Sequence, residues 1–302
     1  MIIDKLIDEI KKKSNPTALG LDTCADYLPG ELRVKIKDFK DAGRVIFEFN
    51  KSIIDAAADL IPAVKLQAAY YEMYGAHGME AYEKTREYAK SRGLITIADV
   101  KRNDIASTAG AYSRAYLSCS DIGIPAYDFD FMTVNPYLGS DGIEPFLADC
   151  KSREKGLFIL VKTSNKSSSE LQNQILKDGR TVYELVGGFV ENWGRDLVGK
   201  YGYSSVGAVV GATQKEEARK IRKAYANMFF LIPGYGAQGG SAADLSVSFD
   251  ERGLGAVVNN SRGIICAHKK FPELKYYEAA RKAVVLMKED LGKERFDSEN
   301  IF

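Results

Sequence analysis

The segment Leu94–Asp104 reads LITIADVKRND, an apolar run that ends in alternating charges. Leu94–Val100 has the length and β-branched content of a strand that is buried on both faces, as in parallel sheets. Asp99 and Lys101 lie two residues apart, so in an extended strand their side chains point to the same side. The segment therefore predicts a buried strand with charged groups at its carboxyl end.

Seven other apolar runs have the same character and predict further strands. They are Thr17–Asp22, Ala63–Leu66, Met132–Asn135, Leu157–Lys162, Val206–Val210, Met228–Pro233 and Gly255–Asn259. Between them lie segments with helical periodicity or with enough length for a helix, such as Val182–Leu197. Eight strands that alternate with helices predict a (β/α)8 TIM barrel of the α/β class, and a doubly wound parallel sheet is the alternative.

The chain has 302 residues, which suffice for one barrel, and we expect residues 1–302 to form a single catalytic domain. The apolar residues of the segment Ile2–Ile10 recur at helical spacing, which predicts an extra helix before the first strand. Charged residues interrupt this segment, so it does not have the character of a signal peptide.

Lys and Arg number 42 and Asp and Glu 41, which gives a formal net charge of +1. This balance argues against a nucleic-acid or membrane-surface partner, since both usually require a basic excess. The apolar runs are also shorter than the roughly 18 residues that a membrane helix needs. Cys24, Cys119, Cys150 and Cys266 are scattered, which indicates small core residues and not a disulfide framework or a zinc site. We therefore expect a cytoplasmic enzyme.

Charged side chains recur at the carboxyl ends of the first three predicted strands, where TIM barrels build their active sites. These residues are Asp22, Lys65, Asp99 and Lys101. Buried charges persist when they are paired, so the two lysines and the aspartates are expected to neutralise one another. A purely structural ion pair is the alternative for Asp99 and Lys101. For Asp104, which precedes a helix predicted from Ile105, the alternative is a helix N-cap.

The glycine-rich segment Gly234–Gly239 (GYGAQG) matches the G-x-G-x-x-G pattern of dinucleotide-binding proteins. It follows the seventh strand, however, and about 20 residues further on the chain has Asn259 and Asn260 where that pattern requires an acid. A phosphate site made by the loops after strands seven and eight explains the glycines better. Arg262, just after strand eight, would clamp the phosphate.

Other polar residues are weaker candidates. Lys162 ends the fifth strand and is interpreted as a solvated strand end, with a Schiff-base lysine as the alternative. His77 is expected on a helix surface and His268 in solvent. The polar segment Ser164–Gln174 is expected to be a loop.

The segment Asp99–Thr108 (DVKRNDIAST) resembles the D-x-K-x-x-D-I-x-x-T signature of the orotidine 5'-phosphate decarboxylase family. The resemblance continues over most of the chain, in the order expected for that family. The matching segments are LGLD ending at Asp22, VKLQ with Lys65, TSN at Thr163–Asn165, PGYGAQGG at Pro233–Gly240 and NNSRGI with Arg262.

The resemblance implies decarboxylation of orotidine 5'-monophosphate to UMP in pyrimidine biosynthesis, with no metal and no cofactor. It implies that Lys101 donates a proton to C6 and that Asp99 lies against the substrate carboxylate. Lys65 and Asp22 would belong to a charged network that also contacts the ribose.

The same resemblance implies a homodimer, in which Asp104, Ile105 and Thr108 reach the active site of the neighbouring subunit. Ser164 would read the pyrimidine edge, with Thr163 as the alternative. The phosphate ligands implied by the resemblance are Gln238, Arg262 and the backbone of Gly239 and Gly240.

Three other functions are alternatives. Sugar-phosphate decarboxylases and hexulose-phosphate synthases share the D-x-K-x-x-D core but use Mg²⁺. A class I aldolase would use Lys162 or Lys65 as a Schiff base. A phosphate-binding protein without activity is the third, although a binding protein has no evident need for the charged array.

Overall fold

A computed structural model describes residues 1–236 and 240–296, apart from the side chains of residues 294–296. Eight parallel strands form a closed barrel in which β1 pairs with both β2 and β8. The strands are β1 Thr17–Gly20, β2 Ala63–Gln67, β3 Ile95–Arg102, β4 Phe131–Val134, β5 Gly156–Lys162, β6 Val206–Val210, β7 Phe230–Ile232 and β8 Ala256–Asn260. The predicted TIM barrel is confirmed, each strand agreeing with its predicted bounds to within two residues, and the doubly wound sheet is excluded.

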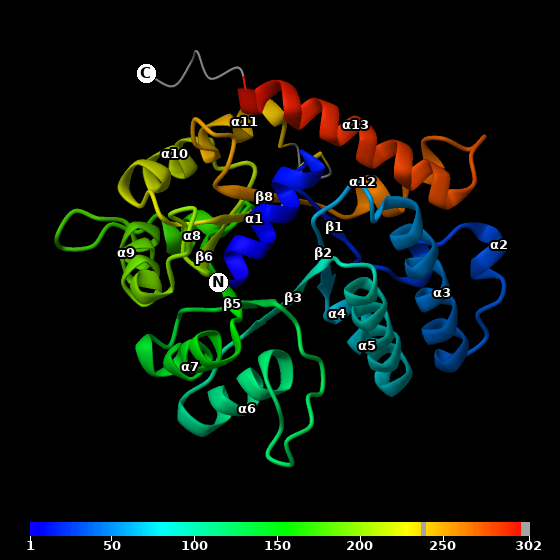
Figure 1. The fold of residues 1–302 in the computed structure, drawn as a ribbon, viewed down its shortest axis with the longest axis horizontal. Helices are drawn as coiled ribbons and strands as arrows, with labels where there is room; N and C mark the ends of the chain where they lie inside the picture. The colour runs from blue at the N-terminus through cyan, green and yellow to red at the C-terminus, as the bar shows by residue number, and fades with distance from the viewer. Residues whose placement is uncertain (237–239, 297–302) are drawn as a thin grey trace.

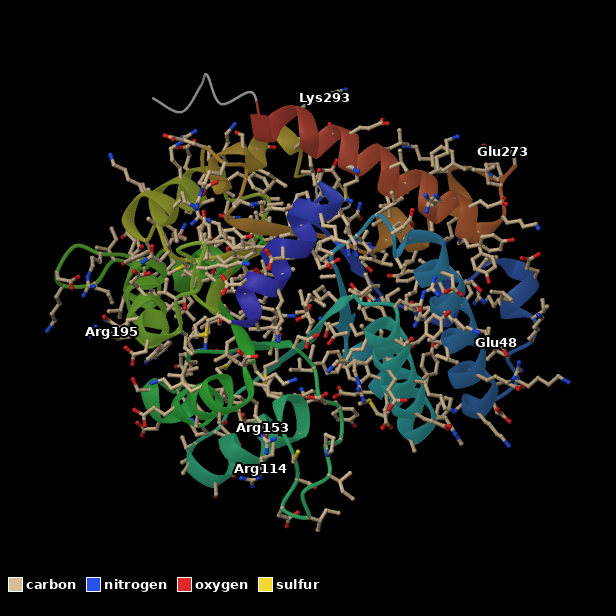
Figure 2. The ribbon with its side chains drawn as sticks, viewed as in Figure 1. Glu48, Arg114, Arg153, Arg195, Glu273 and Lys293 are labelled. Atoms are coloured by element: carbon tan, nitrogen blue, oxygen red, sulfur yellow. The ribbon has the colours of Figure 1, made fainter. Side chains whose placement is uncertain are left out.

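Helices surround the barrel (Figure 1). They are α1 Ile2–Lys13, α2 Gly30–Arg33, α3 Phe39–Ala57, α4 Ala69–Glu72, α5 Gly75–Ser91, α6 Ala106–Leu117, α7 Glu144–Arg153, α8 Ser168–Gln172, α9 Val182–Gly194, α10 Lys215–Ala224, α11 Ala242–Leu245, α12 Arg262–Ile265 and α13 Tyr276–Phe296. Short 3-10 helices lie at Ala25–Tyr27, Ser140–Gly142, Arg195–Leu197, Ser246–Ser248 and Ala267–Lys269. The charged side chains labelled in Figure 2 are exposed on the outside of this ring.

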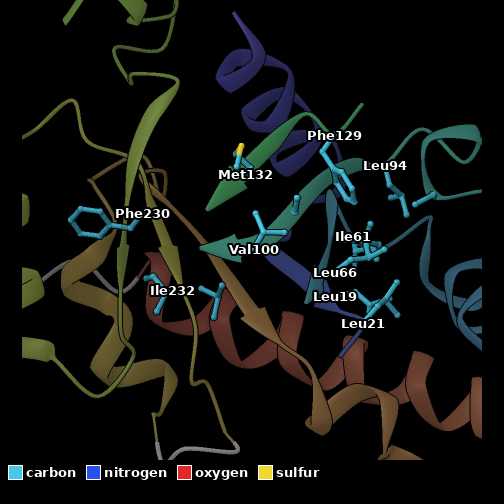
Figure 3. Close-up of a cluster of buried hydrophobic side chains, with 14 of the residues drawn as sticks. Leu19, Leu21, Ile61, Leu66, Leu94, Val100, Phe129, Met132, Phe230 and Ile232 are labelled. Atoms are coloured by element: carbon cyan, nitrogen blue, oxygen red, sulfur yellow. The ribbon is translucent and has the colours of Figure 1, made fainter. Parts of the chain in front are cut away.

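The strands separate two apolar layers because successive side chains point to opposite faces. Residues such as Leu66, Val100, Met132 and Ile232 face outward and pack in the layer beneath the helices (Figure 3). Aromatic and aliphatic residues of the other parity fill the barrel interior, where the rings of Phe131 and Phe158 stack with their centroids 5.0 Å apart.

The extra N-terminal helix, α1, packs against the interior layer. Its buried residues Ile3, Leu6 and Ile7 belong to the same apolar cluster as Phe131 and Phe158, and the helix lies across the barrel in Figure 1. The apolar stripe predicted for the N-terminus is thus buried against the barrel, which gives the interior a closed apolar base.

The inward-facing side chains of the strands change from apolar to polar toward the carboxyl ends. Along β2 the inward residues are Ala63 and then Lys65, and along β3 Ile95 and Ile97 precede Asp99. This alternation brings the charged groups together in one layer at one end of the barrel.

Three local expectations need correction or refinement. Asp104 is not a helix N-cap: α6 begins at Ala106, and no side chain caps its first turn. Asp104 Oδ1 instead accepts a 2.8 Å hydrogen bond from the amide of Ile105. The segment expected as a loop after β5 contains α8. His268 is only partly exposed, and burial lowers its pKa, whereas His77 is exposed as expected.

The cysteines agree in part with the sequence interpretation. All four are free thiols, and Cys24 and Cys150 are buried. Cys266 is partly buried and packs against the core, whereas Cys119 is partly buried and belongs to neither apolar cluster of the described residues, so the interpretation as a core residue is wrong for Cys119.

Candidate active site

A cavity of about 510 Å³ lies at the carboxyl ends of the strands. Seven residues named as candidates from the sequence line it: Asp22, Lys65, Asp99, Lys101, Ser164, its alternative Thr163, and Arg262. Polar residues that were not predicted as ligands also line it, namely Gln67, Thr133, Asn165, Gln172, Tyr235, Asn259, Asn260 and Ser261. The fold thus collects residues from distant parts of the chain around one pocket.

Four charged residues form a continuous chain of ion pairs along one wall of this pocket. Lys65 Nζ lies 3.3 Å from Asp22 Oδ1 and 2.7 Å from Asp99 Oδ2. Lys101 Nζ pairs with the other carboxylate oxygen, Asp99 Oδ1. Signs alternate along Asp22, Lys65, Asp99 and Lys101, and each lysine is paired with an aspartate, as expected from the sequence.

The middle of this chain of ion pairs is buried, and its end at Lys101 is open to the pocket. Lys65 is 2% and Asp99 7% exposed, whereas the side chain of Lys101 is 44% exposed. Burial by itself raises the pKa of Asp99, but Lys65 and Lys101 outweigh it and hold that pKa below its ordinary value. Burial lowers the pKa of Lys65, and Asp22 and Asp99 outweigh that effect and raise it. Both residues are therefore ionised at neutral pH.

An irregularity in β3 orients Lys101. The register between β3 and β4 shifts between Ala98 and Arg102, and Lys101 has φ +47°. This left-handed conformation is unfavourable for a residue with a Cβ by about 1–2 kcal/mol. Such strain persists where surrounding contacts fix it, and here it accompanies the contact between Lys101 and Asp99.

The loops after β7 and β8 meet at the pocket beside Arg262. Gly234 and Gly236 have φ values of +100° and +68°, a conformation that favours glycine. The Gly236 amide donates a 2.9 Å bond to the Gly240 carbonyl. Gln238 and Gly239 lie outside the described residues. Gly240 is buried and does not itself line the described pocket.

The loop after β5 presents Ser164 to the pocket. Thr163 is held on both its polar groups: its amide donates to Gln172 Oε1 at 2.9 Å, and its hydroxyl bonds to Gln172 Nε2 and Asn165 Oδ1. Across the described residues the Ser164 hydroxyl has no such partner, so its bonding capacity is available to a ligand. This difference favours Ser164 over Thr163 as a ligand group.

Lys162 is not the solvated strand end that the sequence suggested. It is 1% exposed, and its Nζ donates to Ser168 Oγ at 3.1 Å and Asn173 Oδ1 at 2.9 Å. Burial lowers its pKa. Its two bonds tie the end of β5 to α8, and it does not line the pocket formed by the described residues.

Asp104, Ile105 and Thr108 do not line the pocket of their own chain in the described structure. Ile105 is a large apolar side chain that is 55% exposed, and Thr108 is exposed as well. The residues implied to serve the partner subunit thus lie on the surface, at the start of α6.

Sequence reasoning missed Thr133 and Gln67, although a signal for both was present. Gln67 follows Lys65 by two residues, and Thr133 follows Phe131 by two, so both have the inward parity of their strands. A polar residue of that parity at the carboxyl end of a strand faces the pocket.

Within 1–236 and 240–296, no three His, Cys, Asp or Glu side chains are grouped so as to hold a metal ion. In the same part of the chain, no helix is long and apolar enough to span a membrane.

The fold and the pocket define a TIM-barrel enzyme with an alternating Lys–Asp array at the carboxyl ends of its strands. Residues 38–277 match the model of the Orotidine 5'-phosphate decarboxylase / HUMPS family. The chain belongs to this family.

Similar proteins extend the match to nearly the whole chain. A protein of Petrotoga mobilis named orotidine 5'-phosphate decarboxylase is 46% identical over 298 residues, which cover 98% of this chain and 99% of that protein. A protein of Clostridium novyi with the same name is 45% identical, covering 97% and 99%. Among solved structures, an orotidine-monophosphate decarboxylase described as putative from Toxoplasma gondii has a TM-score of 0.79 at 27% identity, covering 97% of this chain and 96% of that one. The OMP decarboxylase of Leishmania donovani has a TM-score of 0.75 at 28% identity, with coverage of 98% and 99%.

The buried array predicts a pH-dependent loss of stability in the variant Asp99→Asn. Removal of this carboxylate leaves Lys65 buried beside one weaker partner, so we expect the free energy of unfolding to fall by about 3–5 kcal/mol at pH 7. Because the folded pKa of Asp99 is lowered, its contribution is present above its ordinary pKa of about 4 and is lost at lower pH. Urea unfolding of both proteins from pH 7 to pH 3 should show the difference shrinking.

Asp178→Asn is the matched control, because Asp178 pairs with Arg180 on the surface. Its urea midpoint should stay close to that of the wild type. An Asp99→Asn midpoint equal to that of the control at pH 7 would contradict a stabilising role for the buried pair.

Proposed function

We propose that this chain catalyses the decarboxylation of orotidine 5'-monophosphate to UMP in pyrimidine biosynthesis, with residues 1–302 acting as one catalytic domain. The observation that carries the proposal is the alternating array of Asp22, Lys65, Asp99 and Lys101 in the pocket. The family name also covers HUMPS proteins, but the relatives at about 45% identity are named orotidine 5'-phosphate decarboxylase over nearly their full length.

The array suits a reaction that leaves an electron pair on a carbon atom. When carbon dioxide departs, the electrons of the broken bond remain in the plane of the pyrimidine ring at C6, where the ring delocalises them poorly. A fixed ammonium group stabilises this charge before any proton moves. Lys101 supplies that group, and then transfers a proton from Nζ to C6 to give UMP.

Asp99 contributes through Lys101 and through the substrate. It holds the ammonium of Lys101 by an ion pair, and in the proposed complex it lies against the departing carboxylate. The carboxylate of Asp99 and that of the bound substrate repel each other, and this repulsion is relieved when neutral carbon dioxide leaves. Lys65 and Asp22 hold Asp99 in place and contact the ribose.

The remaining pocket residues bind the rest of the nucleotide. Arg262 at the start of α12 lines the pocket and provides a cation for the phosphate. The resemblance to the family adds Gln238 and the backbone of Gly239 and Gly240 as further phosphate ligands. Ser164 hydrogen-bonds the pyrimidine edge. Phosphate binding is remote from C6, and its energy lowers the barrier where it helps to assemble the charged array.

We further propose a homodimer in which Asp104 of each chain completes the array of the other, with Ile105 and Thr108 beside it. The exposure of Ile105 supports a contact surface at this point, since burial of a large apolar side chain in an interface is favourable. A cytoplasmic location and the absence of a nucleic-acid or membrane partner stay predictions.

The reaction as proposed needs no metal and no cofactor. The direct test follows the loss of orotidine 5'-monophosphate absorbance, with purified protein before and after treatment with EDTA. We expect full activity in both samples. Activity lost with EDTA and restored by Mg²⁺ would favour the metal-dependent members of the barrel family, and no activity in either sample would reject the proposed substrate.

A mixing experiment tests the roles of Lys101 and Asp104 together. Lys101→Ala should abolish turnover and leave UMP affinity largely intact, and Asp104→Ala should also reduce turnover strongly. If each site uses Lys101 of one chain and Asp104 of the other, half of the randomly mixed dimers are hybrids with one intact site of two. An equimolar mixture should then recover about a quarter of wild-type activity (½ × ½). No recovery after confirmed subunit exchange would contradict the shared site.

Arg262→Ala tests the phosphate site. Because the guanidinium is proposed to pair with phosphate and not with the base, we expect the affinity for UMP to fall by about tenfold or more and that for uridine to change little. Calorimetric titration with both ligands measures the contrast. Equal effects on UMP and uridine, or none on either, would argue against this assignment.

A further inference from the structure

Thr133 lines the pocket, and the mechanism above gives it no role. Its hydroxyl nevertheless makes three hydrogen bonds. Thr133 lies on the inward face of β4 and is 1% exposed. Its Oγ1 lies 2.9 Å from the amide nitrogens of Val100 and Lys101 and 3.0 Å from Asp99 Oδ1. One hydroxyl therefore contacts three consecutive residues of β3.

The chemistry of these groups fixes the direction of all three bonds. Backbone amides only donate, so Val100 and Lys101 occupy the two lone pairs of Oγ1. The single hydroxyl proton is then left for the Asp99 carboxylate, which only accepts when ionised. The hydroxyl is thus saturated, and its orientation follows from its neighbours.

The strand irregularity explains why a side chain is needed here. Ala98 pairs with Met132 and Arg102 with Val134, so three residues of β3 lie opposite one residue of β4, Thr133. A regular ladder would bond the β3 amides to backbone carbonyls. At this bulge the Thr133 hydroxyl receives two of them, directly beside the left-handed backbone of Lys101.

We propose that Thr133 is a positioning residue for the decarboxylation: it holds the bulge of β3 and the carboxylate of Asp99 so that Lys101 Nζ is aimed at C6 of the substrate. The catalytic consequence rests on the proposed function. Thr133 itself transfers no proton to the substrate, since its only proton is directed at Asp99.

Other contacts hold the far end of the bulge, so loss of the hydroxyl need not unfold the barrel. The Arg102 carbonyl accepts a 3.2 Å bond from the Asn135 amide, and the Arg102 guanidinium pairs with Glu72 of α4. Thr133→Val, which keeps the shape of the side chain, should therefore fold with a locally relaxed bulge and a misdirected Lys101.

Thr96 offers a matched control in the neighbouring strand. It is likewise buried, and its hydroxyl bonds to an aspartate, Asp130 Oδ2, at 2.9 Å. Thr96 does not line the pocket that the described residues form. Thr96→Val thus removes the same kind of bond from the same barrel without touching the array.

Steady-state kinetics of Thr133→Val, Thr133→Ser and Thr96→Val test the proposal. For Thr133→Val we expect kcat to fall by about 30-fold or more while KM and the UMP dissociation constant change by less than about threefold. Thr133→Ser keeps the hydroxyl and should restore kcat to within about fivefold of wild type, and Thr96→Val should lose stability but keep its kcat. Exchange of the C6 proton of UMP in D₂O should slow in Thr133→Val in parallel with kcat.

Two outcomes would overturn the proposal. The first is a wild-type kcat in folded Thr133→Val. The second is an equal loss of kcat in Thr133→Val, Thr133→Ser and Thr96→Val. If Thr133→Val does not fold, Thr133→Cys replaces it, with an intermediate kcat expected at unchanged KM and a wild-type kcat overturning the proposal.

Amide hydrogen exchange separates this proposal from the proposed function. The amides of Val100 and Lys101 should exchange faster in Thr133→Val than in Thr96→Val, a result that needs no substrate. Faster exchange in a protein whose wild type does not decarboxylate orotidine 5'-monophosphate would reject the proposed function and keep the structural role of Thr133. Unchanged exchange in an active enzyme would reject the role of Thr133 alone.

Discussion

The contact between Lys65 and Asp99 is the constraint on which the site depends. Moving a charged group from water into a protein interior costs several kcal/mol, and a pair offsets this cost only when the partners stay in close contact. The barrel ensures that contact because β2 and β3 are parallel neighbours in a fixed register. Lys65 lies beside Ile97 and Gln67 beside Asp99, so the two charged residues stand diagonally across adjacent strands. A shift of one residue would turn the whole inward face of β3 outward.

The apolar interior of the barrel, at the amino ends of the strands, makes this arrangement of charges rigid. Its interior is filled by apolar side chains, including the stacked Phe131 and Phe158, and α1 packs against them. Close-packed apolar layers leave little room for adjustment. The charged layer therefore rests on a fixed base. Such a base helps to hold a strained residue such as Lys101 at the carboxyl end of β3.

The sequence predicted the barrel because strand length and apolar content are local properties, and it predicted the array because charges at strand ends are visible in the chain. The surroundings of Lys162 were not predictable in this way, since its partners Ser168 and Asn173 lie in a segment whose helix the polar composition conceals. The N-cap alternative for Asp104 is wrong because the residue at which a helix begins depends on tertiary contacts. Thr133 was missed because a threonine is an ordinary strand residue, and its bonds exist only once β3 bulges against β4.

Both oxygens of Asp99 are held, and this bears on how the array would act. Oδ2 accepts from Lys65, while Oδ1 accepts from Lys101 and Thr133. A carboxylate restrained on both oxygens cannot rotate away from an incoming anion, so its charge stays where a substrate carboxylate is proposed to bind. Lys101, the most exposed member, stays beside it and faces the open pocket. The repulsion between Asp99 and the substrate carboxylate and the attraction between Lys101 and the carbanion then come from groups that need not move. Such preorganised charges stabilise a carbanion more than mobile solvent does.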